Sequence, residues 1–212
     1  AYADFDILSR MAAELGNTAD RDTYRQRADA IKSAINNHLI NASGVYVDGL
    51  NSAGEQSVHV SQHANMFPLA LGIVPPANLA SVKAKAKELK MSVGMVTVMW
   101  LVRALGEADE GEHLIELYTN PEWNGLARSL SHGATATWES WFADTNGDSQ
   151  SHAWGAAGLY GYVHYILGIT PLKPQYELVQ IKPLSFGTKL SSAKGKIAAD
   201  RGDISVEWNR DS

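Results

Sequence analysis

Alternating helical segments of two kinds constrain this 212-residue chain more than any other feature. Helical periodicity predicts helices over residues 2–15, from 20 or 23 to 38, and over 59–71, 78–90, 95–105 and 109–118. Segments with one apolar face alternate with more apolar ones, and 95–105 is apolar on nearly every face, which predicts an inner, fully packed helix. Pairs of helices stacked around a ring, an α/α toroid, fit this alternation better than a four-helix bundle does.

The second half of the chain changes character twice. Residues 119–135 are expected to form a long irregular loop, and 153–167 a further helix. That helix carries Gly155, Gly158 and Gly161 at a three-residue period, and no strand precedes them as a phosphate motif requires. The three glycines therefore predict a smooth stripe where another backbone packs closely.

From Tyr176 onward the sequence alternates in the manner of strands, and Arg201-Gly202-Asp203 predicts a hairpin turn between the last two. The fold class predicted is mainly α, a partial (α/α)6 toroid of helical hairpins followed by a short β-rich segment. We place the boundary between residues 1–170, the partial barrel, and residues 171–212, the start of a C-terminal β-sandwich. Because the chain lacks an initiator Met, we expect it to be a piece of a longer protein.

Composition excludes several classes of partner. The net charge of −5 argues against nucleic-acid binding, and the lysines gathered at residues 83–90 predict a solvated helix face. No apolar run approaches the roughly 20 residues that span a membrane. The absence of cysteine removes disulfides and thiolate chemistry, but leaves the compartment open between secreted, periplasmic and cytoplasmic.

The stretch from Ser131 to Gly155 carries the strongest functional signal. It places Glu139 between Trp138 and Trp141, and a polar turn then leads to His152 and a third indole. Indole faces stack on the C–H faces of sugars, and a nearby carboxylate can transfer a proton. The same pattern also occurs at the rim of an ordinary helical core. A carbohydrate site and a structural rim are therefore both open interpretations at this point.

Other chemistries find less support. His59 and His63 lie four apart on a predicted helix without a carboxylate partner, so a structural pair is favoured over a metal site. His113 and His132 stand isolated. The alternating Asp144, Asn146 and Asp148 lack the Glu of a calcium loop and are interpreted as a turn, so we predict no metal and no cofactor.

Glycoside hydrolysis normally uses two carboxyl groups, and the sequence offers one good one, Glu139. Asp48, Glu55 and Asp144 are open as partners, but none has comparable surroundings.

GATATWESW at residues 133–141 resembles the GATTxWExW segment of the family 78 glycoside hydrolases, the α-L-rhamnosidases. The resemblance continues in order through VSQHANMFPLALGIVPP (60–76), VGMVTVMWLVRALGEAD (93–109), SHAWGAAGLYGYVHYILGI (151–169), YELVQIKPL (176–184) and SSAKGKIAADRGDISVEW (191–208). It covers nearly the whole chain.

The resemblance implies an inverting mechanism with two carboxyl groups, in which Glu139 is the general base. It also implies that His152 hydrogen-bonds a rhamnose hydroxyl and that Trp138 and Trp141 line or buttress the pocket. The family's general acid lies in an upstream stretch with no counterpart here, so the fragment alone is expected to have little or no activity.

The resemblance also implies partners: a rhamnose-containing glycan or glycoside, and the missing N-terminal part of the same chain. We further expect self-association, because inner helices such as 95–105 would be exposed. Two alternatives are kept. One is an (α/α)6 enzyme that acts on another sugar, and the other is a non-catalytic carbohydrate-binding module.

Overall fold

The computed structural model describes residues 1–210, and the predicted mainly helical chain with a short β-rich end is confirmed. The chain forms two compact units, Ala1–Ala86 and Lys87–Ser212. Four helices belong to the first part of the chain: α1 (Tyr2–Glu14), α2 (Thr18–Leu39), α3 (Gln62–Ala70) and α4 (Leu79–Glu88), with a 3₁₀ turn η1 (Pro76–Asn78).

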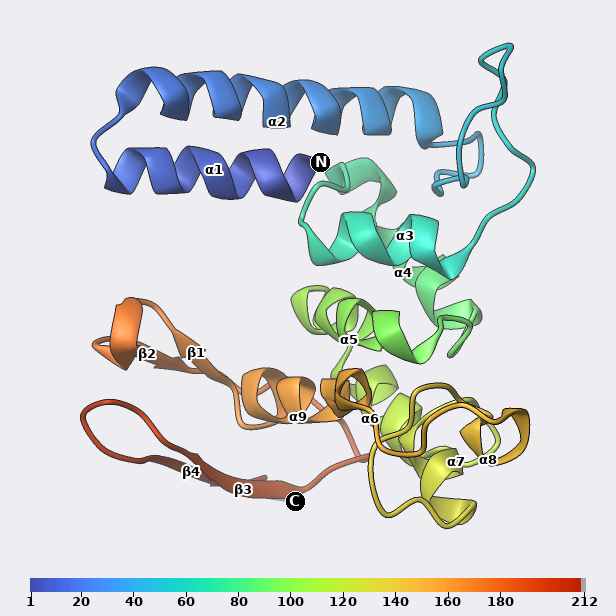
Figure 1. Cartoon of the computed structure of the whole chain (residues 1–212), viewed down its shortest axis with the longest axis vertical. Coiled ribbons are helices and arrows are strands. Elements are labelled where there is room, and N and C mark those ends of the chain that lie inside the picture. Colours follow the sequence, from blue (N-terminus) through green and yellow to red (C-terminus); the bar gives the residue numbers. More distant parts are fainter. Residues whose placement is uncertain (211–212) are drawn as a thin grey trace. The chain divides into compact units, whose positions relative to one another are not determined.

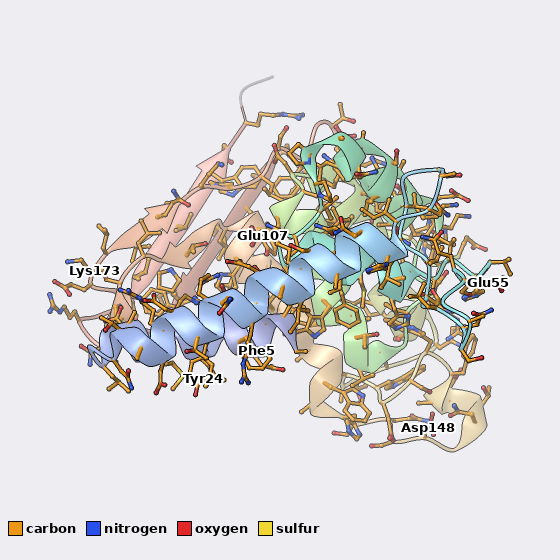
Figure 2. All side chains as sticks on the ribbon, turned by 90° about the horizontal axis from the view of Figure 1, so that it is seen from above. Phe5, Tyr24, Glu55, Glu107, Asp148 and Lys173 are labelled. Carbon is orange, nitrogen blue, oxygen red and sulfur yellow. The ribbon has the colours of Figure 1, made fainter. Side chains whose placement is uncertain are left out.

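In the first unit, α1 and α2 form an antiparallel hairpin (Figure 1). Gly16, at φ +71°, allows the turn after α1, and the Asn17 side chain accepts a hydrogen bond from the Asp20 backbone N–H at 3.1 Å. This cap starts α2 slightly before the predicted residue 20. Phe5 of α1 and Tyr24 of α2 stack with their ring centroids 6.2 Å apart (Figure 2), which helps to hold the two helices together.

The loop between α2 and α3 is held by buried backbone and amide groups. Tyr46 forms an isolated bridge with Ile40, and the Asn65 side chain exchanges two hydrogen bonds with the Tyr46 backbone, each 3.0 Å long. Ser61 caps α3 by accepting from the Ala64 N–H, so the helix begins at Gln62. The predicted start at His59 was therefore wrong, and His59 and His63 do not share a helix.

The helices of the second unit are α5 (Val98–Glu107), α6 (Gly111–Thr119), α7 (Leu126–Ser131), α8 (Ala143–Asn146) and α9 (Ala157–Gly161). Shorter turns flank them: η2 (Met95–Thr97), η3 (Ala153–Ala156), the π-helical η4 (Tyr162–Ile166) and η5 (Pro174–Tyr176). Leu101, Leu105 and Leu114 are among the fully buried side chains of this core.

Two predictions for this unit need correction. α5 is buried along one face but exposes Met99, so it is not packed on nearly every face. The expected loop over 119–135 contains α7, which begins after the extended Gly125. Self-association through residues 95–105 stays a prediction.

The glycine stripe of the predicted helix 153–167 packs as expected, although that segment divides into η3, α9 and η4. A Cβ on Gly155 would lie 2.7 Å from the Thr137 Cβ, and one on Gly161 would lie 2.0 Å from the Tyr118 hydroxyl. Such distances admit no side chain without a shift of the neighbours. Glycine is thus required for the close approach.

Two antiparallel pairs of strands complete the second unit: β1 (Ile169–Pro171) with β2 (Val179–Ile181), and β3 (Ser192–Ile197) with β4 (Ile204–Asn209). The predicted hairpin around Gly202 is confirmed, while β1 was not predicted. Trp208 stacks on Phe186 at 5.8 Å and donates its indole N–H to the Ile166 carbonyl at 2.8 Å. The boundary at residue 170 and the β-sandwich stay predictions, and residues 211–212 of that segment lie outside the described residues.

Within residues 1–210, no helix has the length and apolarity that crossing a membrane requires.

Candidate active site

The candidate site lies where residues 137–139 run beside residues 149–154 of the second unit. His152 donates its backbone N–H to the Thr137 carbonyl at 2.7 Å, and the Thr137 hydroxyl donates to the His152 carbonyl at 2.7 Å. Glu139 donates its N–H to the Ser149 carbonyl at 2.9 Å. These bonds fix the two segments against each other on either side of the intervening loop.

Glu139 presents a partly exposed carboxylate at this junction. Its side chain is 33% exposed, and its Oε2 accepts a hydrogen bond from the Ser149 backbone N–H at 2.9 Å. Among the described residues, no protein donor reaches its Oε1. One oxygen is therefore anchored, and the other keeps its lone pairs for a proton from solvent or substrate.

His152 lies beside this carboxylate. Its Nδ1 is 3.7 Å from the Glu139 Oε2, which is too long for a hydrogen bond but short enough for charge attraction when the imidazole is protonated. The ring is 32% exposed, so it too can meet a bound molecule. The structure thus brings together the predicted base and the predicted sugar-binding histidine.

Trp138 and Trp141 are packed inside the second unit, with exposed fractions of 2% and 5%. The Trp141 indole donates to the Val93 carbonyl at 2.8 Å, and Arg128 donates to the Trp141 carbonyl. Glu139 therefore sits on a backbone held on both sides by buried indoles. Their substrate-binding role stays a prediction, and the burial supports its buttressing form.

The turn at residues 144–149 holds itself together through its own side chains. The Asn146 side-chain amide donates to the Asp148 carboxylate at 2.7 Å. The Asp144 carboxylate lies within hydrogen-bond distance of His132 Nδ1, at 2.7 Å. His132 is therefore not isolated, contrary to expectation, and His113 lies 3.6 Å from the Glu116 carboxylate. No group of three or more His, Asp or Glu side chains in residues 1–210 is arranged to hold a metal ion.

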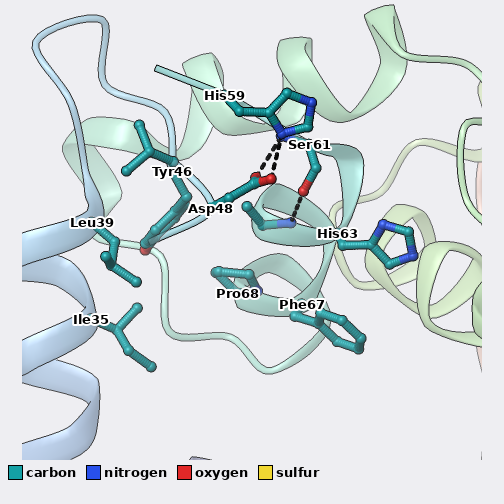
Figure 3. A pocket seen from close by; sticks show the side chains of 11 residues that line it. Ile35, Leu39, Tyr46, Asp48, His59, Ser61, His63, Phe67 and Pro68 are labelled. Atoms are coloured by element: carbon teal, nitrogen blue, oxygen red, sulfur yellow. Dashed lines mark hydrogen bonds and ion pairs between the residues drawn. The ribbon is translucent and has the colours of Figure 1, made fainter. Parts of the chain in front are cut away.

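The first unit holds another carboxylate–histidine pair, Asp48 with His59, at a cavity of about 660 Å³ (Figure 3). Ser61 donates its backbone N–H to the other Asp48 oxygen at 2.8 Å. Desolvation acts to raise the pKa of Asp48, but the hydrogen bonds from His59 and Ser61 outweigh it and lower that pKa below its usual value.

Most of the cavity wall is apolar and comes from α2 and α3, including Ile35, Leu39 and Phe67. Glu55, the other acid weighed as a partner for Glu139, accepts from Asn51 at 2.8 Å within its own loop.

Trp154 is a side chain of this junction to which the sequence reasoning gave no role. It lies in η3, its ring centroid is 3.9 Å from that of His152, and its indole N–H donates to the Glu139 carbonyl at 2.9 Å. Its place two residues after His152 was visible in the sequence. Its contacts depend on the close approach at Gly155, which the glycine period predicted, and on the 3₁₀ turn, which the pattern of residues did not reveal.

The family model that describes the bacterial alpha-L-rhamnosidase six-hairpin glycosidase domain matches residues 1–166. An alpha-L-rhamnosidase of Alteromonas sp. (strain LOR) is 24% identical over 97% of this chain and 23% of its own length.

Solved structures agree with this match. The alpha-L-rhamnosidase of Dictyoglumus thermophilum superposes with a TM-score of 0.85 at 24% identity, over 100% of this chain and 24% of that one. The Streptomyces avermitilis alpha-L-rhamnosidase complexed with L-rhamnose gives a TM-score of 0.78 at 24% identity, over 100% of this chain and 20% of that one. The predicted fold class is confirmed by these likenesses.

The chain spans about a fifth to a quarter of the length of these relatives. With more than three quarters of its residues matched by the family model, the chain belongs to the bacterial α-L-rhamnosidase family of six-hairpin glycosidases.

Proposed function

We propose that this chain supplies the general base and part of the sugar subsite of an inverting α-L-rhamnosidase. The observation that carries the proposal is the geometry of Glu139, a partly exposed carboxylate with one oxygen anchored by Ser149 and His152 alongside. Family membership and the relatives' names favour a rhamnose-containing glycoside as the substrate.

In the proposed reaction, a general acid outside this chain protonates the glycosidic oxygen as the bond from that oxygen to the anomeric carbon breaks. A water molecule attacks the anomeric carbon from the opposite face and loses its proton to Glu139. The products are the free alcohol and rhamnose with inverted anomeric configuration. Inverting enzymes keep their two carboxyl groups roughly 6.5–9.5 Å apart, which leaves room for this water.

His152 is proposed to hydrogen-bond a sugar hydroxyl. Its position beside Glu139 supports this role, because the hydrogen bond and the proton transfer would then involve the same sugar. Trp138 and Trp141 are proposed to act from beneath, because their buried rings hold the peptide units around Glu139 in place.

The test uses the full-length protein that contains this chain, with p-nitrophenyl α-L-rhamnoside as the substrate. The Glu139→Gln variant is expected to lose about 10²- to 10⁴-fold in kcat, the usual contribution of a general base. Proton NMR of the first product formed by the unmodified protein is expected to show the β-anomer.

Retention of the α-anomer, or a variant with unchanged kcat, would refute the proposed mechanism. Binding of rhamnose without any turnover would favour a carbohydrate-binding module instead. Turnover of a different glycoside, with none of the rhamnoside, would favour an enzyme for another sugar.

A further inference from the structure

Trp154 combines exposure with two specific contacts. Its side chain is 42% exposed, although a large indole in a helical core is normally covered. One contact goes to the backbone of Glu139, and the other to the ring of His152. No other residue within residues 1–210 forms a hydrogen bond or ring contact with both Glu139 and His152.

The contact with Glu139 completes the restraint on its peptide units. The N–H of Glu139 is held by the Ser149 carbonyl, its side-chain Oε2 by the Ser149 N–H, and its carbonyl by the Trp154 indole. Each of these three bonds is 2.9 Å long. Loss of the indole N–H would leave the peptide after Glu139 free to rotate and would loosen the direction of the carboxylate.

The contact with His152 fixes an imidazole. The two ring centroids are 3.9 Å apart with 34° between the ring planes, close enough for direct packing of the two surfaces. The backbone of His152 is already tied to Thr137, so its side-chain torsions are the freedom that remains. Trp154 limits that freedom.

Gly155 makes this arrangement accessible. It lets η3 approach residues 137–138 so closely that a Cβ would lie 2.8 Å from the Trp138 carbonyl. The indole of Trp154 is therefore brought within hydrogen-bond distance of the Glu139 carbonyl by the packing of its neighbour.

We propose that Trp154 is a positioning residue, which holds the Glu139 carboxylate through its backbone carbonyl and the His152 imidazole through ring packing. This inference rests on the function proposed above. It adds a role for a side chain that touches neither reacting atom.

Two substitutions separate the two contacts. Trp154→Phe keeps a ring beside His152 but removes the indole donor, whereas Trp154→Ala removes both. In the full-length protein, Trp154→Phe is expected to lower kcat about 3- to 10-fold with little change in KM, the effect of one neutral hydrogen bond. Trp154→Ala is expected to raise KM in addition, because His152 loses its support.

Trp208→Phe is the matched control. Trp208 also donates its indole N–H to a backbone carbonyl and also stacks on an aromatic ring, but these partners are Ile166 and Phe186. Trp208→Phe is expected to lower thermal stability about as much as Trp154→Phe does. It is expected to leave kcat and KM within about twofold of the values for the unmodified protein. An equal loss of kcat in both variants would mean that Trp154 acts only through general stability, and would overturn the proposal.

A double-mutant cycle tests whether Trp154 acts through the base. If it does, Trp154→Phe has no further effect on kcat when Glu139 is already Gln, because coupled residues are not additive. Full additivity would overturn the positioning role. An unchanged kcat in Glu139→Gln would refute the proposed function and this inference together, whereas an impaired Glu139→Gln beside an unaffected Trp154→Phe would refute this inference alone.

Amide hydrogen exchange gives a readout that does not need activity. Trp154→Phe is expected to speed exchange at Glu139 and Ser149 about 3- to 10-fold, since both amides lie in the loosened junction. Exchange at Leu105 in α5 is expected to stay unchanged, as is exchange at Glu139 in Trp208→Phe. Unaltered exchange at Glu139 and Ser149 in Trp154→Phe would overturn the proposal even if the full-length protein shows no turnover.

Discussion

Two of the carboxylate–histidine pairs among the described residues, Asp48–His59 and Glu139–His152, differ in the hydrogen bonds that their carboxylate oxygens already make. Asp48 uses one oxygen for His59 and the other for the Ser61 N–H, so its hydrogen bonds are filled within its own loop. Glu139 has one oxygen on the Ser149 N–H, while His152 stays 3.7 Å away. Both pairs precede a helical segment, and both use a backbone N–H as an anchor.

The difference indicates what each pair is for. A carboxylate that is bonded through both oxygens holds a loop in place, and taking up a proton would break those bonds. A carboxylate with one anchored and one uncommitted oxygen keeps a fixed direction and can still accept a proton. We therefore propose that the Glu139 pair takes part in the chemistry and that the Asp48 pair is structural.

Removing the two histidines in the full-length protein sharpens this comparison and has the largest expected effect. His152→Ala is expected to lower kcat/KM for p-nitrophenyl α-L-rhamnoside about 10- to 100-fold, because the proposed hydrogen bond with a sugar hydroxyl would be lost. His59→Ala is expected to leave kcat/KM within about twofold. Steady-state kinetics measure kcat/KM for both variants. Similar losses in His152→Ala and His59→Ala would contradict the proposed difference between the two pairs.

Gly155→Ala tests whether close packing maintains the Glu139 pair. The added methyl group would press on Thr137 and the Trp138 carbonyl, so we expect a loss of about 1–3 kcal/mol in the free energy of unfolding. Gly94→Ala is the control, since a Cβ there meets no atom within 4 Å, and it is expected to change stability by less than about 0.5 kcal/mol. Urea denaturation measures both, and equal stabilities would show that the junction tolerates a side chain.

Asp48→Asn tests the structural pair and has the smallest expected effect, a loss of about 0.2–1 kcal/mol in unfolding free energy because the pair is exposed to solvent. The pKa of Asp48 is lowered in the folded state, so its stabilisation is present above the unfolded pKa of about 3.9 and disappears as the pH falls through the lower folded value.

The difference in unfolding free energy between Asp48→Asn and the unmodified protein is therefore expected to have its full size at pH 6 and to shrink below about pH 4. Thermal unfolding at several pH values measures it. A difference that stays constant down to pH 2 would show that the carboxylate is not the source.

Periodicity predicted the helices well where a local signal marked their ends. Gly16 follows α1 and Gly72 follows α3, and both have the left-handed backbone conformation that glycine allows at the end of a helix. The start of α3 was predicted three residues too early, because the local cap at Ser61 was not used as a start signal and the pairing of His59 with Asp48 is a contact between segments. Helical spacing carries no information about such contacts.

The candidate site was predicted in its residues but not in its connections. The sequence pointed to Glu139 and His152 through the surrounding indoles and the family resemblance, and these two side chains do lie together. That Trp138 and Trp141 are buried while Trp154 is exposed depends on tertiary packing. The sequence therefore favoured the two indoles nearest to the acid and left the third unassigned.

Azide rescue of Glu139→Ala in the full-length protein tests most directly whether Glu139 activates the nucleophile. Azide attacks the anomeric carbon without losing a proton, so it does not need the base that water needs. We expect azide to restore the rate at least about tenfold, with β-L-rhamnosyl azide as the product, and to leave Asp48→Ala unaffected. No rescue of an impaired Glu139→Ala variant, or equal rescue of Asp48→Ala, would contradict the assignment of Glu139 as the base.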